Sequence, residues 1–236
     1  MNTPSKTVKA GILMLDTAFI RLPGDIGRAD SFRIAVEYHV VRSASVSRVV
    51  NPLGVNRELL NRFIESARAL ESSGASVIGT SCGFLSVAQN ELQNAVSVPF
   101  FSSSLLALPH IRQQRPEARV GVLTFDAEAL SQCHIPAGSG SLGQGIYIQG
   151  LHPQDQLRQV IEQDLERIDE KTAGEQVLQR VEDLIERHGP IDALVLECTN
   201  LSFWKSAMRA QIGVPVVDLV DMIHAAVNGG RLIDME

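Results

Sequence analysis

Short apolar runs alternate with amphipathic segments along the whole chain. Residues 8–15, 77–79 and 193–196 are apolar runs of strand length, and residues 56–73 carry apolar side chains at spacings of three and four. The second spacing is typical of an amphipathic helix, and Gly74 stands where glycine commonly ends one. Strands that alternate with helices predict an α/β fold with mostly parallel sheets and helices on their faces.

The same pattern continues through the rest of the sequence. Further strands are predicted at residues 38–41, 48–50, 98–101, 119–125, 145–149 and 214–217. Further helices are predicted at residues 86–95, up to about residue 114, and at 154–188 (with a break near 172–174), 202–211 and 219–227. Polar residues at or just past strand ends are candidate site residues, because ligands of parallel sheets bind at the carboxyl ends of strands.

Three sequence features recur in the same order in the two halves of the chain. Apolar runs lead to Cys82 and Cys198, and a Val-Pro dipeptide occurs at 98–99 and again at 214–215, both at an offset of 116 residues. The runs at 11–16 and 121–126 are a third pair, at an offset of 110. Such repeats predict a duplicated α/β unit, which can place equivalent residues on opposite walls of one cleft.

Composition and charge narrow the classes of function. The 236-residue chain is 44% hydrophobic and 20% charged, which predicts a packed core, and its net charge is −6. An acidic chain argues against a nucleic-acid groove, and no apolar run approaches the roughly 18 residues of a membrane span. We therefore expect a cytoplasmic protein with no nucleic-acid or membrane partner. In that compartment the three cysteines should stay reduced, and because they form no CxxC pair no zinc site is predicted.

Cys82 and Cys198 each follow a predicted strand and precede a predicted helix. A thiol in that position is expected to have a lowered pKa, because the helix N-terminus and nearby backbone N–H groups stabilise the thiolate. Two such thiols facing each other across a cleft suit a proton transfer with one acid and one base. Cys133 has no counterpart in the repeat, so a structural role is predicted for it.

Three stretches resemble the aspartate/glutamate racemase superfamily, which also includes hydantoin racemases, maleate cis-trans isomerases and arylmalonate decarboxylases. They are Asp16-Thr17, Thr80-Ser81-Cys82-Gly83 and Glu197-Cys198-Thr199-Asn200. The resemblance implies a cofactor-independent racemase with two pseudo-symmetric three-layer α/β lobes, an active site between the lobes, and Cys82 and Cys198 as its acid/base thiols. Oligomeric state stays open, although relatives are often dimers.

The resemblance and the repeat together predict the lobe boundaries and the site. The first lobe is predicted to comprise residues 1–97 and 213–236, and the second lobe residues 98–212, with the strand at 214–217 returning to the first lobe. The predicted substrate-binding residues are Asp16, Thr17, Thr80, Ser81, Gly83, Phe84, Thr124, Thr199 and Asn200. Arg21, Arg28 and Arg33 are alternatives for binding a substrate carboxylate, although a solvent-facing arginine is the simpler interpretation of each. Whether the loops at 21–33 and 136–145 act as lids is open.

Departures from the family pattern bear on the substrate. Gly83-Phe84 stands where amino-acid racemases usually have Asn-Thr, and Asn200 stands where glutamate racemases have His. These differences argue against glutamate, and Phe84 predicts a more apolar pocket wall. Decarboxylases of the superfamily keep only the second cysteine, so the presence of both argues against decarboxylation.

The function predicted from the sequence is an isomerase of amino-acid metabolism: a racemase or epimerase of an amino acid or a related carboxylate or hydantoin. It would use paired cysteines and neither metal nor cofactor. Two alternatives remain. One is a maleate-type cis-trans isomerase with a single nucleophilic cysteine. The other is a non-catalytic protein that binds a small anion.

Overall fold

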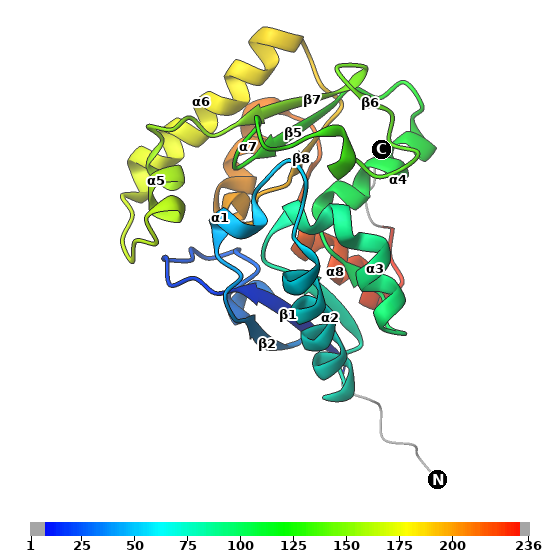
Figure 1. Ribbon diagram of the computed structural model, residues 1–236. Coiled ribbons are helices and arrows are strands. Elements are labelled where there is room, and N and C mark those ends of the chain that lie inside the picture. Colours follow the sequence, from blue (N-terminus) through cyan, green and yellow to red (C-terminus); the bar gives the residue numbers. More distant parts are fainter. Residues whose placement is uncertain (1–7, 232–236) are drawn as a thin grey trace.

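The computed structural model describes residues 8–231, whose strands form two separate sheets (Figure 1). The first sheet has the order β2-β1-β3-β4 and the second the order β6-β7-β5-β8-β9. The strands of the first sheet are β1 (Lys9–Leu15), β2 (Ala35–Val41), β3 (Val77–Thr80) and β4 (Phe100–Phe101). Those of the second are β5 (Val120–Thr124), β6 (Ser141–Leu142), β7 (Gly145–Gly150), β8 (Ala193–Leu196) and β9 (Val216–Val217). The predicted α/β class with two parallel-sheet lobes is confirmed.

Helices cover both sheets and connect the strands. The α-helices are α1 (Val46–Val49), α2 (Arg57–Ser72), α3 (Gln89–Ala95), α4 (Ala107–Gln114), α5 (Gln156–Glu162), α6 (Glu170–His188), α7 (Lys205–Ile212) and α8 (Leu219–Asn228). Short 3-10 helices lie at η1 (Ala29–Ser31), η2 (Gly83–Ala88), η3 (Ser104–Leu106), η4 (Gln132–His134) and η5 (Thr199–Trp204). Among the described residues, no helix combines the length and the apolarity that crossing a membrane requires.

Helix α2 illustrates how the apolar spacing produces the packing. Asn56 caps its first turn, with Oδ1 accepting the N–H of Leu59 at 2.9 Å, which satisfies one of the free amides of the first turn. The stripe predicted from the sequence, including Phe63 and Leu70, is buried against the first sheet. Gly74 follows the helix at φ +93°, a conformation that glycine adopts without strain.

The two sheets repeat one topology. With the short β6 set aside, β1, β2, β3 and β4 occupy the same relative places as β5, β7, β8 and β9. Cys82 follows β3 and Cys198 follows β8, so the cysteines end equivalent strands of the two units. This arrangement is what the duplicated sequence pattern predicts.

The predicted lobe boundaries are wrong at two strands. Phe100–Phe101 pairs with β3 in the first sheet, and Val216–Val217 pairs with β8 in the second, so neither strand leaves its own repeat unit. The return to the first lobe comes one element later, with α8, which packs on β3 and β4. The first unit likewise crosses to the second lobe: η3, which follows β4, contacts β8. There the Ser104 hydroxyl donates to the Leu196 carbonyl oxygen at 2.6 Å. Each unit therefore completes its own sheet before it crosses to the other.

Two local predictions also differ from the structure. Residues 48 and 49 form the end of helix α1, and Val50 follows the helix rather than belonging to a strand. The long charged helical region is broken at residues 163–169 and is continuous through residues 172–174. Gly174 is required there by packing, because a Cβ at this position would lie 2.7 Å from Trp204 Nε1. A glycine that accommodates a tryptophan ring looks like a helix break when only the sequence is considered.

Candidate active site

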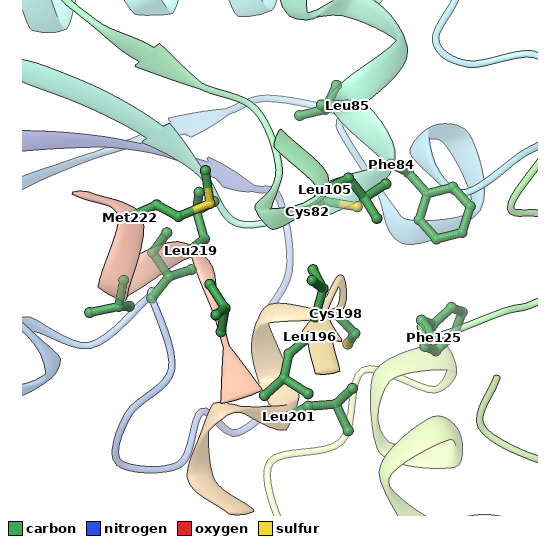
Figure 2. Packing of buried hydrophobic residues seen from close by; sticks show 14 of the residues in the cluster. Cys82, Phe84, Leu85, Leu105, Phe125, Leu196, Cys198, Leu201, Leu219 and Met222 are labelled. Carbon is green, nitrogen blue, oxygen red and sulfur yellow. The ribbon is translucent and has the colours of Figure 1, made fainter. Parts of the chain in front are cut away.

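Both repeat-related cysteines line one small cavity between the lobes. Each is the residue preceding a 3-10 helix, Cys82 before η2 and Cys198 before η5, and both are largely buried. Figure 2 shows them on facing segments, with the rings of Phe84 and Phe125 to one side. The cavity is small: the volume accessible to water is about 30 Å³.

The backbone around the two thiols is built alike. Ser81 Oγ accepts the N–H of Leu15 at 2.9 Å at the end of β1. In the second unit the Glu197 carboxylate accepts the N–H of Phe125, just past the end of β5. Each cysteine is thus preceded by a residue whose side chain accepts a hydrogen bond from a backbone N–H at the end of the first strand of its own unit.

Burial favours the protonated form of both thiols. Burial raises the pKa of Cys82 to about 12, and the charge of Glu197 adds to the increase. Burial and Glu197 also raise the pKa of Cys198 well above its ordinary value. The N–H groups of Phe84 and Asn200 favour the respective thiolates but do not compensate for the loss of solvation. The expected lowering of the thiol pKa is therefore wrong, because desolvation outweighs the local donors.

Glu197 is the main residue that the sequence interpretation missed. It directly precedes Cys198, is 1% exposed and lines the cavity. Burial raises its pKa to about 7, against stabilising hydrogen bonds from Thr124 and the Phe125 amide. The available signal was a carboxyl residue at the end of an otherwise apolar strand, where a charge is costly to bury.

A polar chain extends from Cys198 on the second wall. Its Sγ donates to Asn200 Oδ1 at 3.6 Å, and Asn200 Nδ2 donates to the buried Asp25 at 2.6 Å. Asp25 also pairs with Arg21 at 3.0 Å. Arg21 is thereby engaged within the protein, and Arg28 pairs with Asp30. Of the three arginines considered for the substrate, none lines the cavity.

The predicted binding residues divide into three groups. Ser81, Gly83, Phe84, Thr199 and Asn200 line the inner cavity with the thiols. Asp16 and Thr17 line a neighbouring outer pocket of about 310 Å³. The outer pocket and the inner cavity share four lining residues: Val46, Val50, Phe125 and Ile161.

Thr80 and Thr124 lie behind the cavity, which corrects their predicted contact with substrate. The Thr80 hydroxyl donates to the Ser102 carbonyl oxygen at 2.7 Å, and the Thr124 hydroxyl donates to Glu197 Oε2 at 2.6 Å. Neither residue lines the inner or the outer pocket. Both hydroxyls are used to hold the strand ends in place.

The first long loop forms part of the site. The N–H groups of Ala18 and Phe19 both donate to Asp164 Oδ1 at 2.8 Å, and Phe19 lines the inner cavity. Since Asp164 belongs to the segment between α5 and α6, the loop bridges the two lobes over the thiols. Within residues 8–231, no group of three or more His, Cys, Asp or Glu side chains is arranged to hold a metal ion.

Comparison with known proteins gives the class. The Asp/Glu/Hydantoin racemase family model matches residues 29–227, and the chain belongs to this family. A solved allantoin racemase from Klebsiella pneumoniae superposes with a TM-score of 0.58 at 14% identity, over 96% of this chain and 91% of that one. This similarity supports the two-lobe fold.

Two curated relatives of the chain are named as lyases. The chain is 25% identical to a dimethylsulfoniopropionate lyase of Durusdinium sp. clade D, over 91% of this chain and 72% of the relative. It is also 25% identical to dimethylsulfoniopropionate lyase 3 of Emiliania huxleyi (strain CCMP1516), over 89% of this chain and 56% of the relative. The chain thus spans little more than half the length of the second relative.

Proposed function

We propose that the protein is a cofactor-independent racemase or epimerase that moves a proton at the carbon next to a carboxylate or carbonyl group. The observation that carries this proposal is the shared cavity: two thiols from equivalent strand ends line it from opposite lobes. A substrate carbon held between them has a proton acceptor on one face and a proton donor on the other.

In the proposed reaction one cysteine, as the thiolate, takes the α-proton. The C–H electron pair stays on the substrate and is delocalised onto the adjacent carbonyl or carboxylate oxygen, which gives an enolate. The opposite thiol then returns a proton to the other face, so the two sulfurs exchange protonation states. Burial makes the thiolate scarce at neutral pH but also makes it a stronger base, which removal of a proton from carbon requires. The racemisation rate should therefore rise with pH as the thiolate fraction increases.

The lining of the inner cavity favours a small substrate. Leu15, Phe19, Phe84 and Phe125 give apolar walls, and no Lys or Arg is among the lining residues that the structure describes. The backbone amides of the turns after the cysteines are the donors available to a substrate carboxylate. A larger substituent would extend past Val46 and Ile161 into the outer pocket.

A second candidate is a lyase, and the two curated relatives favour it. Elimination begins with the same step: a thiolate takes the α-proton of a carboxylate. The C–H electron pair then forms a C=C bond, and a β-substituent departs with its bonding pair. Only one thiol needs to act as base, so the two cysteines would contribute unequally.

Deuterium exchange separates these functions. Amino acids, hydantoins, 2-substituted carboxylates and dimethylsulfoniopropionate are incubated with the enzyme in D₂O and followed by proton NMR and chiral chromatography. A racemase replaces the α-proton with deuterium as the configuration inverts. A lyase forms an alkene, acrylate in the case of dimethylsulfoniopropionate. If no acid on the panel exchanges or eliminates, the proposal is contradicted and anion binding becomes the better interpretation.

A further inference from the structure

The Glu197 carboxyl group is directed across the lobe seam at the turn that follows Cys82. A Cβ built on Gly83 would overlap Glu197 Oε1 and would lie 2.5 Å from the Glu197 carbonyl oxygen and 2.8 Å from Ser103 Oγ. Only glycine leaves room for the carboxyl at this point. Gly83 and Glu197 therefore form a matched pair, one from each lobe, beside both thiols.

The two oxygens of this carboxyl have different surroundings. Oε2 accepts the Thr124 hydroxyl at 2.6 Å, whereas Oε1 is buried and has no hydrogen-bond partner among the described residues. An unpaired buried carboxylate oxygen would be costly, while a protonated Oε1 is a donor awaiting an acceptor. The pKa of about 7 supports a carboxyl that carries a proton over much of the neutral range.

We propose that Glu197 is a neutral carboxylic acid that donates a hydrogen bond from Oε1 to the substrate carboxylate as the α-proton leaves. The inference rests on the proposed proton transfer at an α-carbon. A neutral acid does not repel an anionic substrate, and it interacts more strongly as negative charge moves onto the carboxylate oxygens in the enolate. It supplies the donor that a cationic side chain would otherwise supply in this cavity. The proton stays on Glu197, and the thiols carry out the transfer.

The groups that face Glu197 determine how pH acts on this role. From the first lobe these are the Cys82 thiol and the Ser103 hydroxyl, and from its own lobe the Cys198 thiol and the Thr124 hydroxyl. The Arg21–Asp25 pair lies farther away: the charge of Asp25 adds to the raised pKa of Cys198 and that of Arg21 opposes the raised pKa of Cys82, while Asp25 also accepts a hydrogen bond from Asn200. Since both thiols stay protonated below the pH at which Glu197 ionises, loss of the Glu197 proton is the first titration expected in the site.

The first test needs no substrate. Infrared difference spectra of the wild-type protein, recorded between pH 5 and pH 9, should contain the C=O band of a protonated carboxyl that disappears around pH 7. The band should be missing from Glu197→Gln and unchanged in Glu186→Gln, which alters an exposed glutamate of α6. With acetate as the probe, hydrogen bonding should shift the wild-type band, and Glu197→Ala should bind acetate at least about 10-fold more weakly. A missing band, or a band that acetate does not move, would overturn the proposal.

The second test follows the α-proton exchange of the substrate found in D₂O. Glu197→Gln keeps a donor and should retain exchange within about 10-fold at pH 6, whereas Glu197→Ala should lose about 10²- to 10³-fold. Above pH 7 the rate should rise less steeply with pH in the wild type than in Glu197→Gln, because only the wild type loses its neutral donor there. If Glu197→Gln is as inactive as Glu197→Ala at every pH, Glu197 acts as a carboxylate and the proposal is wrong. No exchange in the wild type together with an acetate-sensitive band would count against the proposed reaction and leave the donor role of Glu197 supported.

Discussion

The two cysteine walls have the same construction and different chemistry. At the constant offset of 116 residues, Ser81 corresponds to Glu197, Gly83 to Thr199 and Phe84 to Asn200. The first wall is small and apolar around its thiol. The second has a buried acid before its thiol and a polar chain through Asn200 to Asp25 behind it.

This difference shows what duplication preserves and what it leaves free to change. Strand order and the amide contact from the first strand of each unit are kept, so the two sulfurs still meet at one cavity. The side chains around the sulfurs have diverged, so the two faces of a bound substrate meet unequal electrostatics. The backbone symmetry favours a two-sided proton transfer, and the electrostatic asymmetry allows the two directions to differ.

Removing either thiol should have the largest effect. Cys82→Ala and Cys198→Ala should each lower racemisation by about 10²- to 10⁴-fold, because a proton must leave one face and return to the other. Each variant should still exchange the α-proton of one enantiomer in D₂O, and the two variants should favour opposite enantiomers. Cys133→Ala, at an exposed thiol, should match the wild type. Equal residual racemisation in both single variants would contradict the assigned roles, and sensitivity to only one substitution would indicate a lyase or a one-cysteine isomerase.

The pair Ser81 and Glu197 should differ in how they link stability to pH. Because the folded-state pKa of Glu197 is about 7 against an ordinary 4.5, its stabilising contribution is complete below pH 4.5 and is lost as pH rises toward 7. Urea unfolding should show the wild type losing about 3 kcal/mol relative to Glu197→Gln between pH 4.5 and pH 8.

Ser81→Ala provides the control for that measurement. It removes the acceptor of the Leu15 amide and should cost about 1–3 kcal/mol at every pH, because no titratable group is involved. A pH-independent difference between the wild type and Glu197→Gln would show that the Glu197 carboxyl is not held neutral.

Gly83→Ala tests the fit between the walls. The added methyl group has to displace the Glu197 carboxyl or separate the lobes, so a loss of about 1–3 kcal/mol in unfolding free energy is expected. Gly230→Ala is the matched control, since its Cβ would have no neighbour closer than 3.8 Å. Equal stability of the two variants would mean that the carboxyl is free to move away from Gly83.

Thr199→Ala should have the smallest effect. The Thr199 hydroxyl donates a hydrogen bond to the Ser81 carbonyl oxygen of the other lobe at 3.1 Å. Gly83, its equivalent in the first unit, has no side chain that could form the corresponding hydrogen bond. Its loss should cost about 1 kcal/mol in unfolding free energy, and Thr199→Ser should recover most of that. A serine variant as unstable as the alanine variant would assign the effect to the methyl group instead.

Features that depend on local pattern could be predicted from the amino-acid sequence. Apolar runs and helical spacing predicted the α/β class, the repeat offset placed Cys82 and Cys198 at equivalent strand ends, and three short motifs identified the family. These features follow from the period of side chains along the backbone and from residues adjacent in the chain.

Features that depend on contacts between distant segments required the folded structure. Whether Thr80 and Thr124 face the cavity, which sheet Val216–Val217 joins, and whether Arg21 is available to a ligand all depend on partners far away in the sequence. The protonation of the thiols and of Glu197 depends on how completely the closed lobes exclude water. Desolvation is set by every chain segment that surrounds a group, so no local motif contains it.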